Sequence, residues 1–169
     1  MKAVRLLSIL FLGIFLTSTA HAKDLKIAYV ELGSVFNSYQ KTKDFDGVLQ
    51  KESQVAKEKV EGMIKKINDD QGKLALLKED ERQRLQADIE KQVAALKEFE
   101  SQKRAELAKK FEDMRKQIIL EIEKVVSDAA KTDGYTFVLS DASILYGEKE
   151  ANITEKVLKT LNDNYAGKK

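Results

Sequence analysis

Between Asp44 and Asp133 the sequence contains no proline and consists largely of Lys, Glu, Gln, Ala, Leu and Arg. These residues have the strongest helix propensities, so the stretch predicts very long helices. A stretch of this length with only a narrow apolar stripe has no globular core of its own. We therefore expect it to extend well beyond the core that the two ends of the chain build.

Apolar residues recur at steps of three and four along this stretch, as they do on one face of a helix. The second half carries a narrow stripe: Leu107, Phe111, Met114, Ile118, Ile122 and Val125. The first half carries a looser stripe: Phe45, Leu49, Ala56, Val60, Met63, Ile67, Leu74 and Leu77. Each stripe is able to cover the other, which predicts a coiled-coil-like antiparallel helical hairpin.

The reversal of this hairpin is predicted within residues 74–81, which places the arm at residues 44–131. Apolar residues from Leu74 to Leu77 are followed there by Glu79, Asp80 and Glu81. Acidic residues favour a helix N-terminus because they interact with the helix dipole. The alternative is one uninterrupted helical rod of twice the length, and it stays open because this segment lacks a Gly or Pro turn signal.

Strand-like segments flank the arm on both sides. Residues 26–32 alternate and are rich in Ile, Tyr and Val, and residues 135–140 and 143–146 are short runs of the same type. Gly134 is suited to end the long helix, because glycine adopts the left-handed cap conformation without strain. A last amphipathic helix is predicted over residues 152–165, so the fold class is α+β.

Residues 23–43 and 132–169 are too few to form a stable sheet-based core alone. Open sheet edges would also remain. We therefore expect these segments to form a β-rich body in which several copies of the chain associate. The predicted oligomer interface consists of Ile27, Tyr29, Val30, Phe137 and Leu139.

The first 22 residues have the organisation of a cleaved export signal. Lys2 and Arg5 precede an apolar run from Leu6 to Leu16, and an A-x-A site ends at Ala22. The run is shorter than the roughly 20 residues that cross a bilayer, which disfavours the alternative of a membrane anchor. Cleavage after Ala22 would place the mature chain in the periplasm.

The residue inventory argues against catalysis. The chain has no cysteine, and its one histidine, His21, lies in the predicted signal. The usual nucleophiles, general bases and zinc ligands are therefore missing from the mature chain, and no glycine-rich nucleotide motif is present. We expect a protein that is not an enzyme and that uses no cofactor or metal.

Charge composition argues against nucleic-acid binding as well. The whole chain has 30 basic and 28 acidic residues, and removing the signal takes away Lys2 and Arg5, which leaves 28 of each. A nucleic-acid-binding protein needs a basic surplus to displace counterions from phosphates. The pattern is typical of a solvated helical surface with interleaved ion pairs.

The predicted turn carries three leucines that a slender hairpin cannot bury as a globular core would. Leu74, Leu76 and Leu77 are therefore candidates for contact with a client polypeptide. The alternative, equally open, is that they form a small apolar plug that closes the turn.

Both ends of the mature chain resemble the Skp/OmpH family. IAYVELGSVF at residues 27–36 is similar to the opening strand-helix motif of that family. YTFVLSDASILY at 135–146 and NITEKVLKTLN at 152–162 are similar to its strand hairpin and final helix. Glu31 and Asn152 stand where the pattern leads us to expect aspartates.

The resemblance implies a jellyfish-shaped homotrimer with a β-rich body and three helical arms around a cavity. It also implies an ATP-independent holding chaperone that binds unfolded outer-membrane proteins. Some members carry basic arm tips associated with lipopolysaccharide or anionic lipid. Lys73, Lys78, Arg82 and Arg84 are the candidates here, although residues 65–91 contain as many acidic as basic residues.

Two other functions remain open. One is a structural or adaptor coiled coil of the cell envelope without chaperone activity. The other is a membrane-anchored stator subunit of the ATP-synthase b type, which also joins an apolar N-terminus to a long charged helix. The latter does not account for the terminal strand motifs or for the A-x-A site.

Overall fold

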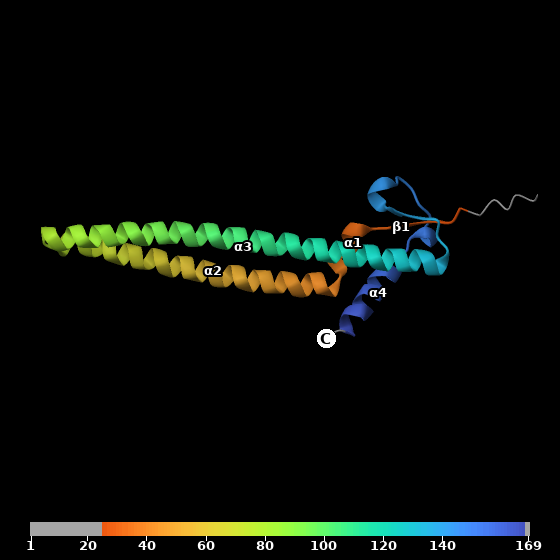
Figure 1. Cartoon of the computed structure of the whole chain (residues 1–169), viewed down its shortest axis with the longest axis horizontal. Coiled ribbons are helices and arrows are strands. Elements are labelled where there is room, and N and C mark those ends of the chain that lie inside the picture. The colour runs from red at the N-terminus through yellow and green to blue at the C-terminus, as the bar shows by residue number, and fades with distance from the viewer. Residues whose placement is uncertain (1–24, 168–169) are drawn as a thin grey trace, which may run out of the picture.

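The computed structural model describes residues 25–167, which form a two-helix arm on a small α+β body (Figure 1). This arrangement confirms the predicted fold class. The predicted signal peptide, residues 1–22, lies outside the described residues.

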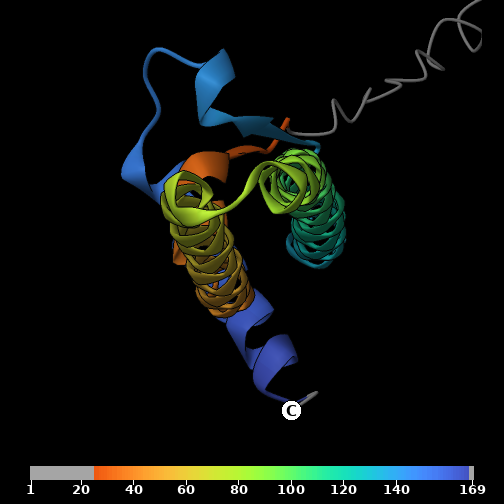
Figure 2. The same cartoon turned by 90° about the vertical axis from the view of Figure 1, so that its left-hand side faces the viewer.

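The arm is an antiparallel pair of long helices. Helix α2 spans Gln40–Lys73 and helix α3 spans Glu79–Asp133. Between them a 3-10 turn, Leu74–Leu76, reverses the chain. At 1.5 Å per residue, the 34 residues of α2 reach about 50 Å. Figure 2 looks along the arm and shows the two helices side by side, so the uninterrupted rod is not adopted.

Local signals define both ends of α3. Glu79, Asp80 and Glu81 occupy its first turn, where the helix dipole favours carboxylates. At the other end Gly134 has φ 73° and ψ 27°, and its N–H donates to the carbonyl of Ala130. A side chain at that φ would be strained, so the predicted glycine stop is confirmed.

Two short strands bring the ends of the described chain together in the body. Strand β1, Ile27–Val30, pairs in parallel with β2, Phe137–Ser140, so that Ala28 lies opposite Val138. The other side of β1 makes a parallel bridge from Tyr29 to Asn152, and the Ile153 N–H donates to the Tyr29 carbonyl at 2.9 Å. Two segments from the C-terminal part of the chain therefore flank β1, which comes from the N-terminal part.

The predicted strand at residues 143–146 is not formed, and the strand hairpin implied by the resemblance is absent from the described residues. Residues Asp141–Ser143 form a 3-10 turn instead. Two side-chain bonds favour this exit from the sheet. The Ser140 hydroxyl accepts the Ala142 N–H two residues on, and the Asp141 carboxylate accepts the Leu32 N–H from the distant start of α1. Leu145 and Tyr146 consequently remain exposed.

Two short helices complete the body. Helix α1 spans Leu32–Ser38, and helix α4 spans Thr154–Ala166. The last helix thus begins two residues later than predicted. Asn152 lies outside it, where its side-chain carbonyl accepts the Thr154 N–H at 2.9 Å and its amide donates to Glu31 at 2.8 Å.

The core lies where the last third of α3 packs against β1, α1 and α4. Its buried members are Ala28, Val30, Val35, Tyr39, Met114, Ile118, Ile122, Val125, Ile153, Val157 and Leu161. Truncating a buried side chain of this size to alanine typically costs about 2 to 5 kcal/mol. This cluster therefore supplies most of the packing energy of the fold.

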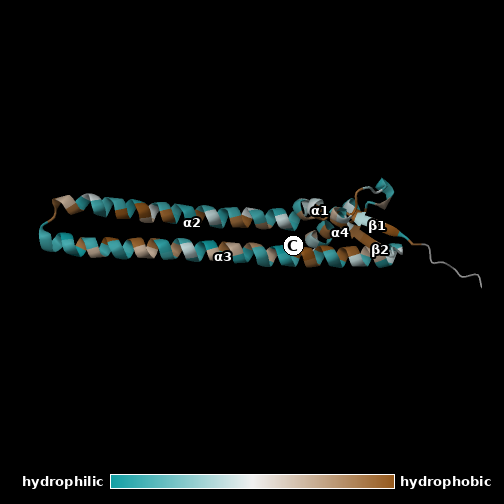
Figure 3. Cartoon of the chain, turned by 90° about the horizontal axis from the view of Figure 1, so that it is seen from above, coloured by the Kyte–Doolittle hydropathy of each residue, from teal (hydrophilic) through white to brown (hydrophobic). Residues whose placement is uncertain are grey.

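Fewer buried apolar side chains hold the two helices of the arm together than hold the body together. Beyond the core, the buried apolar residues of the arm are Ile67 and Ile89 among the described residues. Figure 3 shows hydrophobic positions concentrated on β1 and β2 and scattered along α2 and α3. Few buried contacts make local opening inexpensive, so the arm is the part able to adapt its shape. None of the helices within residues 25–167 is long and apolar enough to span a membrane.

Candidate functional site

The tip of the arm combines an exposed leucine with two half-buried ones. Leu76 is 86% exposed, whereas Leu74 and Leu77 are half-buried. The Leu77 N–H donates to the Leu74 carbonyl, and the Arg82 guanidinium donates to the Leu77 carbonyl at 3.3 Å. Leu74 and Leu77 are therefore partly covered at the turn, whereas Leu76 is exposed and stays the candidate for client contact.

The predicted basic residues of the tip are partly neutralised. The Lys73 ammonium lies 2.7 Å from the Asp70 carboxylate, and this contact raises the pKa of Lys73 and lowers that of Asp70. Arg82 pairs with Glu79 at 3.4 Å. Within residues 25–167, Lys78 and Arg84 are in no ion pair. The four candidates thus do not form one strongly positive patch.

The outer face of the small sheet exposes most of the predicted interface residues. The register places Ile27 beside Phe137 and Tyr29 beside Leu139, so these four side chains share one face. Phe137 is 54% exposed, and Ile27 and Leu139 are also exposed. Across residues 25–167, the edge of β2 that faces away from β1 pairs with no strand. An apolar face beside an open edge suits association with another chain.

Val30 corrects part of the predicted interface. It is 3% exposed and belongs to the core of its own chain. Side chains alternate along a strand, so Val30 lies on the inner face with Ala28, opposite the face of Tyr29. Its side chain supports the body from within and has no surface to offer to another subunit.

A cluster of aromatic and charged groups joins the arm to the body. The Tyr39 hydroxyl donates to Glu121 at 3.0 Å, and Lys41 pairs with the same carboxylate at 2.5 Å. The Tyr165 hydroxyl donates to Asp44 at 3.0 Å, and the rings of Tyr39 and Tyr165 meet edge to face at 5.9 Å. Burial, and then the hydrogen bond to Glu121, raise the pKa of Tyr39. These contacts fix the base of α2 against α3 and α4.

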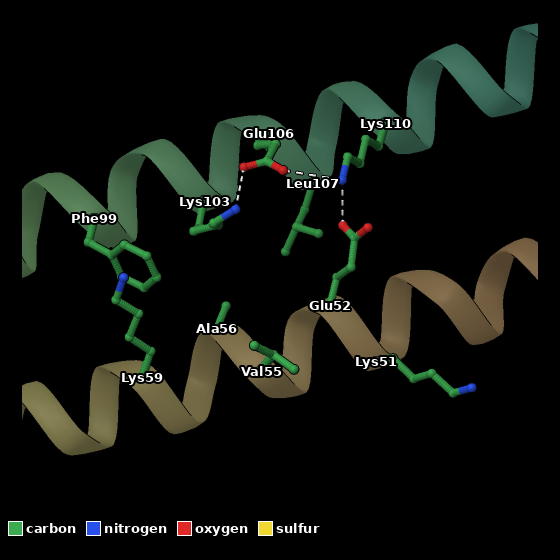
Figure 4. Close-up of a pocket in the computed structure, with 10 residues that line it drawn as sticks. All are labelled: Lys51, Glu52, Val55, Ala56, Lys59, Phe99, Lys103, Glu106, Leu107 and Lys110. Atoms are coloured by element: carbon green, nitrogen blue, oxygen red, sulfur yellow. Dashed lines mark hydrogen bonds and ion pairs between the residues drawn. The ribbon is translucent and has the colours of Figure 1, made fainter.

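Midway along the arm, a groove of about 460 Å³ opens between α2 and α3. Figure 4 shows its lining, which comprises Lys51, Glu52, Val55, Ala56, Lys59, Phe99, Lys103, Glu106, Leu107 and Lys110. Ala56 and Leu107 belong to the two predicted seam stripes, and a groove between the stripes was not predicted from the sequence. The sequence feature that could have indicated the groove is Ala56, because an alanine in a seam leaves space that a larger side chain would fill.

Several carboxylates of the described residues are engaged in ion pairs, among them those of Glu52, Asp70 and Glu106. Within residues 25–167 no group of three or more acidic, histidine or cysteine side chains is placed to hold a metal ion. Lys110 pairs with Glu52 and Glu106, and these contacts raise its pKa. At the groove, apolar side chains therefore lie between charged side chains that pair with one another, an arrangement suited to binding.

Comparison with known proteins shows which family has this architecture. The family described as Outer membrane protein (OmpH-like) matches residues 26–161, which is more than half of the chain. The chain belongs to the OmpH-like family. Its match begins just before β1 and ends within α4, so it spans the arm and both parts of the body.

A curated relative of this OmpH-like chain is Chaperone protein Skp of Vibrio cholerae serotype O1. The two are 26% identical over 167 residues, which covers 95% of this chain and 96% of the Vibrio protein. A crystal structure described as that of an OmpH-like outer membrane chaperone from Caulobacter crescentus CB15 has a TM-score of 0.77. That match covers 83% of this chain and 85% of the Caulobacter chain at 12% identity, so it shows the common fold.

Proposed function

We propose that this chain is an ATP-independent holding chaperone of the periplasm. It binds unfolded outer-membrane proteins between the helical arms of a homo-oligomer, for which the family resemblance implies three copies, and so prevents their aggregation on the way to the outer membrane. Membership of the OmpH-like family and similarity to a protein named Skp chaperone support the proposal.

The observation that carries the proposal is the apolar surface left open along the arm. Val48, Val55 and Ile64 of α2 are exposed, as is Leu76 at the tip. They are separated by charged residues and do not form one deep pocket. Many weak apolar contacts on several arms give avidity without a tight single site, which suits polypeptides of varied sequence.

Release in this mechanism requires no nucleotide. An outer-membrane protein that folds into the bilayer turns its apolar side chains toward lipid and satisfies its backbone in a closed barrel. The client then no longer exposes the apolar surface that the arm binds. The thinly packed arm also adapts to clients of different size, because few buried contacts resist its deformation.

The test is an aggregation assay with the processed chain and no nucleotide. An outer-membrane barrel protein is diluted from urea in the presence of the chain at near-stoichiometric ratio, and light scattering is followed. We expect suppressed scattering. An envelope coiled coil with a purely structural role would leave the scattering unchanged, and that result would reject the chaperone proposal.

Processing is tested on the protein recovered from the periplasmic and inner-membrane fractions of the cell. Mass spectrometry of its N-terminus is expected to identify Lys23 as the first residue. An intact N-terminus retained in the inner membrane would instead favour the stator-like alternative.

A further inference from the structure

The groove in the middle of the arm has an apolar floor. Val55 and Ala56 come from α2, and Phe99 and Leu107 come from α3. In Figure 4 the Leu107 side chain points across toward α2, and the Ala56 methyl group does not fill the space between the helices. Val55 remains 65% exposed beside this space. The helices are therefore paired here without a packed seam.

A lysine covers the one aromatic ring of the groove. The Lys59 ammonium lies 4.5 Å from the centroid of the Phe99 ring, and Figure 4 shows the Lys59 side chain extending from α2 to that ring. An exposed cation–π contact of this kind is weak, and a long lysine side chain moves easily. The Phe99 ring is thus a stacking surface with a movable cover.

The rim of the groove is positively charged. Lys51, Lys59, Lys103 and Lys110 line it with only two carboxylates, those of Glu52 and Glu106, so its formal balance is +2. Lys110 bonds to both carboxylates, and Lys103 pairs with Glu106. The acidic groups are therefore engaged by two lysines. Lys59 contacts an aromatic ring and remains available to an incoming carboxylate.

We propose that this groove is a client subsite that binds an aromatic side chain of an unfolded polypeptide with a carboxylate close to it in sequence. The aromatic ring displaces Lys59, packs on Phe99 and Leu107, and brings its neighbouring carboxylate to the released ammonium. This assignment rests on the proposed chaperone function and specifies one place on the arm where client recognition occurs.

The groove fits clients of the proposed class in two ways. Its volume falls within the roughly 300 to 1,000 Å³ of typical ligand sites, although it is open along one side. An extended chain is able to lie across it and insert a side chain without enclosing its own backbone. Strands of outer-membrane barrels alternate apolar and polar residues and carry aromatic girdles, so they present aromatic groups near polar neighbours.

The binding test uses tryptophan fluorescence, because the chain itself contains no tryptophan. The probe is a short Gly/Ser-rich peptide that carries one Trp with an Asp two residues away. With the processed oligomer we expect a blue shift and a rise in anisotropy. A peptide with Lys in place of Asp is expected to bind more weakly. A peptide with Ser in place of Trp gives no fluorescence signal, so it is added as a competitor, and it is expected not to displace the tryptophan peptide.

The deciding variant is Ala56→Leu, which fills the groove. Both residues are strong helix formers, so the arm retains its helicity, which circular dichroism checks. If binding occurs in the groove, affinity falls by about tenfold. If the arm is merely a sticky apolar surface, the added leucine leaves affinity unchanged or raises it, and the proposal is overturned.

A matched pair of exposed valines locates the site. Val55 lines the groove, and Val48, 50% exposed, lies on the same helix outside it. Val55→Ser and Phe99→Ala are expected to weaken peptide binding, whereas Val48→Ser is expected to leave it unchanged. Equal losses from the two valine variants would contradict a localised subsite.

Failure of this inference is distinguishable from failure of the proposed function. If the wild-type chain suppresses aggregation of the barrel protein but the tryptophan peptide does not bind, the subsite is rejected and the holding function stands. If the peptide binds in the groove but aggregation is not suppressed, the holding function is rejected.

Discussion

The Asn152 side-chain amide donates a hydrogen bond to the Glu31 carboxylate at 2.8 Å, across 121 positions of sequence. In the same cluster the Glu31 N–H donates to the Thr154 hydroxyl at 2.9 Å. The segment before α4 is thereby tied to the end of β1. The two residues that depart from the expected family pattern are therefore partners of one another, and the neutral amide satisfies the carboxylate without adding charge.

We predict that Asn152→Asp destabilises the body. The new carboxylate would face Glu31 and remove its donor, at a cost of about 1 to 3 kcal/mol in the free energy of unfolding. Urea denaturation at neutral pH measures the change. Asn68→Asp, an exposed substitution on α2, is the control and should change the value by less than about 0.5 kcal/mol. Equal effects of the two variants would show that the Glu31 contact contributes nothing.

Gly147 allows the segment after β2 to pack closely against Tyr29. A Cβ at position 147 would lie 2.6 Å from the Tyr29 ring. Gly147→Ala is therefore expected to lower the free energy of unfolding by about 1 to 3 kcal/mol. Gly62→Ala on α2 meets nothing within 4 Å and should raise it by about 0.5 to 1 kcal/mol. Thermal melting of both variants checks the opposite signs.

Tyr39→Phe tests the junction between arm and body. The hydroxyl that donates to Glu121 is lost, and we expect a decrease of about 1 to 2 kcal/mol in the free energy of unfolding at pH 7. Tyr146→Phe removes an exposed hydroxyl and serves as the control. A Tyr39→Phe variant as stable as the wild type would show that the Glu121 contact does not hold the arm.

The same residue predicts a pH dependence. Burial and the bond to Glu121 raise the pKa of Tyr39 in the folded state above its ordinary value of 10.0. The folded state therefore binds the phenolic proton more tightly than the unfolded state. The resulting stability is complete below about pH 10 and is lost as pH rises above it. Stability curves between pH 8 and 11, compared for wild type and Tyr39→Phe, should differ by a constant amount below about pH 10 and approach one another as pH rises above it.

Leu76→Ser tests the contact role of the arm tip. The side chain is 86% exposed, so the free energy of unfolding should change by less than about 0.5 kcal/mol. The amount of barrel protein kept from aggregating should fall, because an exposed apolar contact is lost. Leu120→Ser, also exposed but on the part of α3 near the body, is the control. Unchanged holding by the Leu76 variant would remove the tip from the client surface.

Phe137→Asp tests the proposed association of the bodies. A charge on the outer face of β2 would be buried against another chain, so we expect the mass in solution to fall toward that of one chain. Phe111→Asp places the same charge at an exposed position of the arm and should leave the mass unchanged. Light scattering at micromolar concentration distinguishes the outcomes. A wild-type chain that is itself monomeric would reject the interface.

Much of this fold was predictable from local sequence patterns. The helix formers of the arm, the acidic first turn of α3 and the glycine after it each act within a few residues, so pattern and propensity predict them. The meeting of the two chain ends followed from the hairpin. The strand predicted at residues 143–146 is not formed, although its alternation is compatible with a strand. Alternation does not reveal that the side chains of Ser140 and Asp141 hold a 3-10 turn at this point.

The sequence by itself determined the long arm and the two strands Ile27–Val30 and Phe137–Ser140 at its base, because these depend on propensity and periodicity. It left the reversal open between a hairpin and a rod, because the segment lacks a Gly or Pro turn signal. Only the tertiary structure decided that Val30 faces inward, that Glu31 meets Asn152 and that Ala56 leaves a groove beside Phe99. Those relationships depend on which residues distant in sequence come to lie opposite one another. That pairing is set by register and packing across the whole chain, and no local pattern contains it.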